Sequence, residues 1–165
     1  FDLKKISNRI FLDFQLPEGR GDLSKLKIDK KIINLIDESY NSNPLSLKTS
    51  LINFANLDSK NSLKHVLLGD MLELGRNSSS HHKSITKLIN KLNIHKVHVY
   101  GKDIKDTYVG VVKNKKGSIL ENLTDFENFI KKTLNSGDYL MIKGSNSTGL
   151  YKKTQLLKLD NRYGL

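Results

Sequence analysis

The segment from residue 30 to residue 51 constrains the fold of this chain more than any other. It begins with an apolar run of strand length, passes through a polar loop, and opens a helix at Pro44. Pro is favoured at the first position of a helix, and Asn43 just before it is a good N-cap. The loop therefore joins the carboxyl end of a buried strand to the positive end of a helix. Open α/β sheets bind ligands and phosphates at such places.

Strand and helix patterns alternate along the chain, which predicts βαβ units and a largely parallel sheet. The expected strands are short and apolar, and they cover 26–28, 32–36, 65–68, 96–100 and 138–142, with one more at 109–112 or 118–120. The expected helices start at Pro44, span 85–92, start at the capping box of Thr124 and Glu127, and start at Ser147. The expected fold is an α/β three-layer sandwich with a Rossmann-like, mostly parallel sheet.

Length and composition limit the class of protein. The chain has 165 residues, enough for one domain with a proper core. Residues 1–22 end in a turn-rich break and are expected to be the tail of a preceding domain plus a linker, with 23–165 as the domain. The start lacks an initiator Met and a signal pattern, which predicts a fragment of a longer chain. The absence of cysteine excludes disulfides and thiolate metal sites, and it fits the cytoplasm.

The formal net charge of +11 is carried mainly by lysine, because only four of the 28 basic residues are arginine. Proteins that bind nucleic acid usually need arginine for bidentate contacts or aromatic side chains for stacking. The composition therefore favours solvated surface lysines that attract anionic nucleotides. A basic nucleic-acid-binding module remains the non-enzymatic alternative, and it would bind oligonucleotides with a steep salt dependence. No apolar run approaches the roughly 18 residues that a membrane span needs.

The loop after the 32–36 strand gathers a carboxylate, hydroxyls and amides on Asp37, Ser39, Tyr40, Asn41 and Asn43. This set suits a polyhydroxylated, phosphorylated ligand, since carboxylates accept from ribose hydroxyls while amides and a helix terminus donate to phosphate. The alternative is that Asp37 and Asn43 only turn and cap the chain.

Three further segments carry candidate residues. Arg20 lies between two linker glycines, where its guanidinium can reach phosphate oxygens, or where it is an ordinary exposed arginine. Asp70 and Glu73 follow the 65–68 strand and can hold an ammonium group or cap helices. His82 can shuttle a proton, although packing against that loop is the favoured interpretation. Lys143 ends the last strand as an anion-binding corner or a solvated turn.

These motifs together resemble those of the Mur ligase family. The segment 37–44, Asp-Glu-Ser-Tyr-Asn-Ser-Asn-Pro, resembles the Asp-Glu-Ser-Tyr-Asn-Ala-Asn-Pro signature of the branch that adds D-alanyl-D-alanine. The linker motif 19–21, the segment 69–75 with His82, and the segment 143–145 resemble three more family motifs, in the same order. Asn146 stands where many members have Arg, so no contact of that Arg is transferred to this chain.

The resemblance implies the C-terminal lid of a ligase that adds D-alanyl-D-alanine to UDP-MurNAc-tripeptide, a peptidoglycan precursor, through an acyl phosphate. ATP and Mg²⁺ would be held mainly by a central domain, which with an N-terminal domain is absent from this sequence. The chain has no Gly-x-x-Gly-Lys-Thr/Ser phosphate loop, so the fragment alone is expected to be inactive. The expected partners are those three substrates, in the cytoplasm, with neither nucleic acid nor a membrane.

The resemblance also divides the candidate residues into two groups, without assigning a catalytic residue or a metal ligand. The nucleotide side comprises Arg20, Asp37, Tyr40, Asn41 and Asn43. The dipeptide side comprises Asp70, Glu73, Lys143, Gly144 and Ser145, with His82 as a further candidate. All these loops are expected to converge on one rim of the sheet. Another Mur or folylpolyglutamate-type ligase is the alternative, and the loop 40–44 argues against it because sister families usually carry a His-containing loop there.

Overall fold

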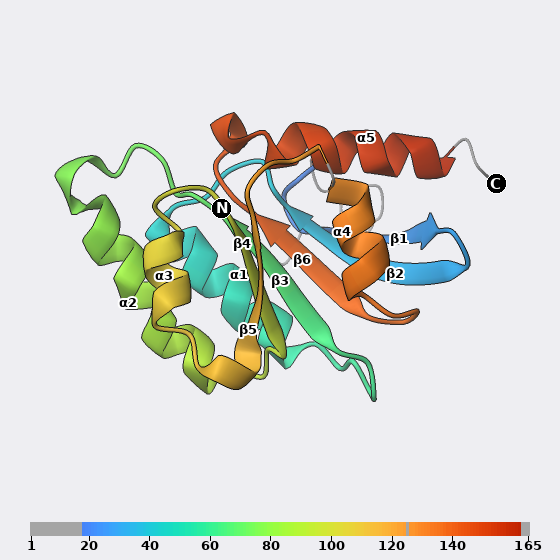
Figure 1. Cartoon of the computed structure of the whole chain (residues 1–165), viewed down its shortest axis with the longest axis horizontal. Coiled ribbons are helices and arrows are strands. Elements are labelled where there is room, and N and C mark those ends of the chain that lie inside the picture. Colours follow the sequence, from blue (N-terminus) through green and yellow to red (C-terminus); the bar gives the residue numbers. More distant parts are fainter. Residues whose placement is uncertain (1–17, 125, 163–165) are drawn as a thin grey trace, which may run out of the picture.

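The computed structural model describes residues 18–124 and 126–162, and within them six strands form one sheet in the order β1-β2-β6-β3-β4-β5 (Figure 1). β1 pairs antiparallel with β2 at one edge, whereas all the other neighbouring strands pair in parallel. The strands are β1 (Asp22–Ile28), β2 (Lys31–Glu38), β3 (Lys64–Gly69), β4 (Lys96–Tyr100), β5 (Lys116–Leu120) and β6 (Tyr139–Lys143). The expected mostly parallel sheet is confirmed.

Helices cover both faces of this sheet, which confirms the three layers (Figure 1). One face carries α1 (Pro44–Asn56), α2 (Ser78–Lys91) and α3 (Lys105–Val109), and the other carries α4 (Phe126–Thr133) and α5 (Leu150–Arg162). Short 3-10 helices lie at η3 (Gly75–Asn77), η4 (Lys113–Lys115) and η5 (Asn146–Thr148).

The central strand β3 contributes to the hydrophobic core on each face, and every residue in it is buried. Because side chains alternate along a strand, Val66 and Leu68 pack under α1 and α2, whereas Leu67 packs on the side of α4 and α5. A strand buried on both faces reads as a continuous apolar run, which is the usual pattern in parallel sheets.

Most element positions agree with the sequence-based predictions. Asn43 caps α1 in a capping box with Ser46, and α1 begins at Pro44 as predicted. The strand left open between two segments lies at 116–120, and Val109 instead ends α3. Residues 1–17 of the predicted tail and linker lie outside the described residues, and β1 already begins at Asp22.

The predicted start of the last helix at Ser147 is wrong. Residues 146–148 form η5, and Gly149 follows it with a φ of 83° in the left-handed region that favours glycine. This residue turns the chain before α5 begins at Leu150.

Lysine ammonium groups bind the carbonyls at the carboxyl ends of four of the described helices. Lys64, which is only 1% exposed, donates to the Ala55 carbonyl in the last turn of α1 at 2.6 Å. The equivalent lysines for α2, α3 and α4 are Lys115, Lys116 and Lys31. A cation is favourable there because the helix dipole is negative at that end. The prediction that the lysines are solvated surface residues is therefore wrong for Lys64.

A buried polar chain runs through the core beneath α4. The Ser118 N–H donates to Nδ1 of His98 at 2.8 Å, so a neutral His98 carries its proton on Nε2. That atom lies 3.1 Å from Nδ1 of His65, and Nε2 of His65 lies 3.6 Å from the carboxylate of Asp138. Burial is the main cause that lowers the pKa of both histidines, and it lowers the pKa of His98 to about 3.

The two buried histidines predict that acid destabilises the domain at a pH above the range in which its carboxylates titrate. The folded protein keeps both histidines neutral, whereas the unfolded chain binds protons as the pH falls below the ordinary value of 6.5. The free energy of unfolding should therefore be largest above that pH. For His98 alone it should fall by about 2 kcal/mol between pH 7 and pH 5. Urea unfolding at several pH values measures this slope.

The variant His98→Asn should flatten that pH dependence, because it removes the residue with the lowest histidine pKa. His81→Asn, on the half-buried side of α2, is the matched control and should keep the wild-type slope. Equal slopes for His98→Asn and the wild type would contradict the assignment.

Candidate functional site

The loops after β2, β3 and β6 meet at the carboxyl edge of the sheet, as the sequence predicted. Ser145, which follows β6, connects the other two loops. Its backbone N–H donates to the carbonyl of Asp70 at 3.0 Å, and its hydroxyl donates to the carbonyl of Ser42 at 3.3 Å. The same hydroxyl oxygen accepts the N–H of Leu72 at 2.9 Å. A single serine therefore fixes the spacing between the loops on the two sides of β6.

Two glycines allow the ends of β3 and β6 to approach each other. A Cβ placed on Gly69 would lie 2.6 Å from a methyl group of Leu150 and 3.3 Å from the Cα of Gly144. A Cβ on Gly144 would lie 3.1 Å from the Cα of Gly69. Without side chains at these positions, the first residue of α5 packs directly onto the rim, under the site.

Asp37 holds its loop in place from inside the protein, since its side chain is fully buried. One carboxylate oxygen accepts the N–H and the hydroxyl of Ser39, at 3.1 and 2.5 Å. The other accepts the Gln155 side-chain amide at 2.8 Å and the Lys158 ammonium at 3.0 Å. Both oxygens are thus engaged within the protein, which corresponds to the turning and capping role that the sequence left open for Asp37.

The remaining residues expected on the nucleotide side are exposed at the rim. The Arg20 guanidinium lies 4.6 Å from the centre of the Tyr40 ring, which is a cation–π contact. The side-chain oxygen of Asn41 accepts the N–H of Ser42 at 2.7 Å, and Asn43 caps α1. The linker arginine and the loop after β2 therefore lie side by side.

Lys143 points toward the loop after β2, although the sequence placed it on the dipeptide side. Its ammonium lies 3.0 Å from the Asn41 carbonyl and 3.3 Å from a carboxylate oxygen of Glu38, and its side chain is 2% exposed. Burial lowers the pKa of Lys143; the charge and hydrogen bond of Glu38 oppose this shift, and the charge of Arg20 adds to it.

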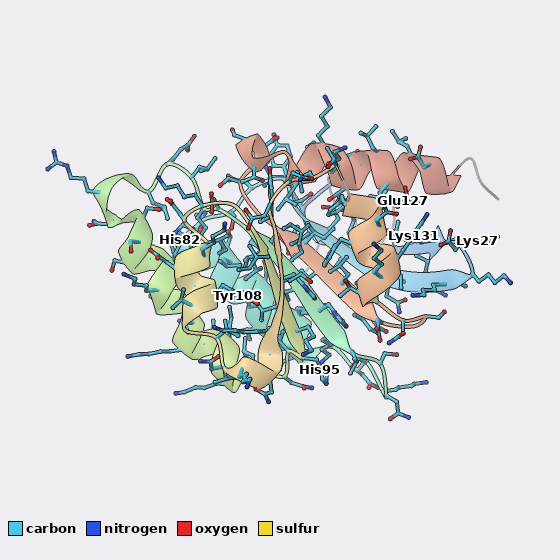
Figure 2. The ribbon with its side chains drawn as sticks, viewed as in Figure 1. Lys27, His82, His95, Tyr108, Glu127 and Lys131 are labelled. Atoms are coloured by element: carbon cyan, nitrogen blue, oxygen red, sulfur yellow. The ribbon has the colours of Figure 1, made fainter. Side chains whose placement is uncertain are left out.

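The loop after β3 is fixed by its own polar groups. The Asp70 carboxylate accepts the N–H of Ile104 at 2.7 Å and that of Lys102 at 3.0 Å, so it organises the turn after β4. Glu73 is exposed, with a φ of 65°. His82, labelled in Figure 2, is a fully buried residue of α2.

The hydrogen bonds of His82 show how it contacts this loop. Its Nε2 accepts the N–H of Met71 at 3.1 Å, and its Nδ1 donates to the carbonyl of Ser78 at 2.8 Å. This bonding assigns the proton to Nδ1. The favoured interpretation from sequence, packing against the loop, is confirmed.

A pocket of about 470 Å³ opens beside this loop, between the carboxyl ends of β3, β4 and β5. It contains charges of both signs, and its lining includes Asp70, Lys102, Lys105, Glu121 and Ser147. Lys105 and Glu121 form an exposed ion pair at 3.3 Å. The residues after β4 and β5 were not among the candidates from the sequence, although Lys102 and Lys105 come just after the predicted strand at 96–100, which was a usable signal.

The described part of the chain contains no group of three or more His, Asp or Glu side chains placed to hold a metal ion. Within the same residues, no helix combines the length and the apolar character that crossing a membrane requires.

The sequence model of the family "Mur ligase, glutamate ligase domain" matches residues 25–146, which is most of the chain. The chain belongs to the Mur ligase family. Its fold is that of the Mur ligase C-terminal domain, and this family membership does not favour the nucleic-acid-binding alternative.

Two curated relatives of this chain carry the same description. A UDP-N-acetylmuramoyl-tripeptide–D-alanyl-D-alanine ligase of Rickettsia prowazekii is 26% identical over 148 residues, which are 90% of this chain and 32% of the relative. The ligase of the same name from Bacillus subtilis is 28% identical over 131 residues, which are 78% of this chain and 28% of the relative. This chain thus spans about a third of the length of these relatives.

Solved structures of Mur ligases share the fold. The MurF ligase of Thermotoga maritima, in complex with ADP, superposes with a TM-score of 0.71 at 17% identity, covering 91% of this chain and 33% of that one. MurF of Acinetobacter baumannii gives 0.67 at 21% identity, with 88% and 31% covered.

The bridging position of Ser145 predicts that Ser145→Ala destabilises the domain by about 1–2 kcal/mol, because the Leu72 N–H loses its buried acceptor. The midpoint of urea unfolding measures the change. Ser80→Ala makes the same chemical change at an exposed position of α2, and its free energy of unfolding should stay within about 0.5 kcal/mol of wild type. Identical midpoints for Ser145→Ala and wild type would show that the bridge does not stabilise the rim.

Proposed function

We propose that this domain is the C-terminal lid of a cytoplasmic, ATP-dependent ligase that adds D-alanyl-D-alanine to UDP-MurNAc-tripeptide during peptidoglycan precursor synthesis. The observation that carries the proposal is the convergence of the loops 37–43, 69–75 and 143–145 on one rim, held together by Ser145. These are the segments whose sequences resemble the motifs of that branch. The names of the curated relatives support the same assignment.

The reaction brings two anions, ATP and the tripeptide carboxylate, together with an amine, and it passes through an intermediate that water would hydrolyse. Phosphorylation of the tripeptide carboxylate gives an acyl phosphate, the dipeptide amine attacks its carbonyl carbon, and phosphate leaves from the tetrahedral intermediate. A lid contributes by positioning the reactants and by excluding water. The residues of this chain therefore bind and orient, and none of them needs to react.

On the nucleotide side, the groups exposed at the rim are Arg20, Tyr40, Asn41 and Asn43. The Arg20 guanidinium supplies a positive charge and a planar fork for phosphate oxygens. Its contact with Tyr40 keeps it beside the loop after β2, and the amino end of α1, which follows this loop, also favours an anion through its helix dipole. Asp37 supports this surface from beneath and has no free oxygen for the ligand. A related MurF structure contains ADP, which is consistent with a nucleotide in such an enzyme.

On the dipeptide side, the pocket beside Asp70 has the size and the mixed charge that a small zwitterion needs. Lys102 offers an ammonium for the dipeptide carboxylate. Glu73 and Glu121 are exposed carboxylates near the same loops and can attract the dipeptide ammonium. Gly144 and Ser145 set the distance between this pocket and the nucleotide side, and buried Lys143 adds positive charge between the two.

ATP and Mg²⁺ are assigned mainly to the central domain, following the resemblance of the motifs, and Arg20 adds one contact to the phosphates from this domain. ATP supplies the phosphoryl group that activates the carboxylate.

The nucleotide assignment predicts large losses of activity for Arg20→Ala and for Asn41→Ala in the full-length ligase. Each should reduce turnover by at least ~100-fold, because charge stabilisation and positioning are lost while the exposed side chains contribute little to folding. Phosphate release with all three substrates measures the rate. Lys25→Ala, at an exposed position of β1, removes a charge away from the rim and serves as the control. Wild-type rates for Arg20→Ala and Asn41→Ala would overturn the assignment.

The pocket assignment predicts that Lys102→Ala raises KM for D-alanyl-D-alanine about tenfold, the loss expected for one hydrogen bond to a charged group. KM for ATP should stay unchanged, since Lys102 lies on the other side of β3 from Arg20. Initial rates at varied dipeptide and varied ATP test both parts. A rise confined to KM for ATP would place the dipeptide elsewhere.

A further inference from the structure

Helix α5 lies beyond the residues that the family model matches, yet it contacts the two segments that carry the nucleotide side. Tyr151, Gln155 and Lys158 occur at helical spacing, so they lie on one face of α5. Tyr151 contacts the loop after β2, Gln155 contacts Asp37 near the carboxyl end of β2, and Lys158 contacts both Asp37 and Asp22, the first residue of β1. This face of α5 therefore contacts the segments that carry the nucleotide side, in addition to packing onto the core.

Lys158 joins the start of β1 to the carboxyl end of β2. Its side chain is 6% exposed, and its ammonium contacts the carboxylates of both Asp22 and Asp37. Burial alone would lower the pKa of Lys158, but the hydrogen bonds and charges of these two carboxylates outweigh it and raise the pKa. The other carboxylate oxygen of Asp22 accepts the N–H of Gly19 at 2.9 Å, so the connection continues into the linker.

Tyr151 fixes the same linker from its other side. Its ring packs edge-on against the Tyr40 ring, with the centroids 5.4 Å apart. Gly19 lies between these two side chains, because a Cβ added there would be 3.0 Å from atoms of each. Backbone bonds complete the attachment: the Tyr40 N–H donates to the Gly19 carbonyl at 3.1 Å, and the Gly21 N–H donates to the Asp37 carbonyl at 2.7 Å.

We propose that α5 is a positioning element that fastens the linker segment 19–21 to the loop 37–43, so that Arg20 and the nucleotide-facing loop move with the domain as one unit. Lys158 and Tyr151 are the positioning residues, acting through Asp37, Asp22 and Tyr40. The catalytic consequence rests on the proposed ligase function, whereas the fastening itself does not. Rotation about Gly19 and Gly21 would break these contacts, so these glycines are not the pivot of domain closure.

Hydrogen exchange of backbone amides measures directly whether α5 holds the linker in place. The amides of Gly19, Gly21 and Tyr40 each donate within the attachment, so their hydrogen exchange reports whether it is intact. A buried ion pair with only a structural role would lower stability without changing the exchange of these amides relative to β3. It would also leave KM for ATP unchanged in the folded enzyme.

The test uses the full-length ligase that carries this domain, with Lys158→Met and Tyr151→Leu. Lys152→Met is the matched control, since Lys152 is exposed on α5. Lys158→Met should speed exchange at Gly19, Gly21 and Tyr40 about tenfold or more and raise KM for ATP about tenfold, while KM for D-alanyl-D-alanine stays at the wild-type value. Tyr151→Leu, which leaves the ion pairs intact, should shift the same quantities in the same direction. Lys152→Met should match wild type.

The inference is overturned if Lys158→Met folds and keeps wild-type exchange and wild-type KM for ATP. If Lys158→Met does not fold, Tyr151→Leu decides, and unchanged exchange together with unchanged KM overturns it. If the wild-type enzyme does not ligate the dipeptide, the proposed function fails. In that case the exchange rates of the variants still decide whether α5 fastens the linker.

Discussion

The parallel pairing of β2, β6, β3 and β4 is the constraint on which the site depends. Parallel strands end at the same edge, so loops far apart in the sequence are brought to one rim. The central strand can hold this arrangement because it is buried on both faces by separate helix layers. Gly69 and Gly144 then let neighbouring strand ends come close enough for one serine to bridge the loops.

The rim is rigid because its polar groups are bonded to the protein itself. Asp37, Asp70 and His82 each accept backbone N–H groups of neighbouring loops, which holds those loops in place. A binding site needs such support, because its exposed groups keep a defined position only when the residues beneath them are fixed. In this domain the exposed layer is formed by Arg20 and Tyr40 on one side and by the pocket residues on the other.

Local patterns in the sequence were sufficient for most of the fold. The apolar runs of β3 and β4, the proline that opens α1 and its asparagine cap all act within a few residues, so they can be recognised without the rest of the chain. The start of α5 was misplaced because a left-handed glycine, two residues after the expected start, redirects the backbone. The burial of Lys64 was also missed, because its partner is a carbonyl in the last turn of α1, on another element.

The sequence by itself determined which loops form the rim, because strand order along the chain and motif composition are local properties. Only the tertiary structure decided what each polar side chain does there. Asp37 turned inward to Lys158 and Gln155, more than a hundred residues away, and Lys143 turned toward the loop after β2. The physical reason is that a charged group is stabilised by its partner across space, and spacing along the chain carries no information about a partner supplied by a distant helix.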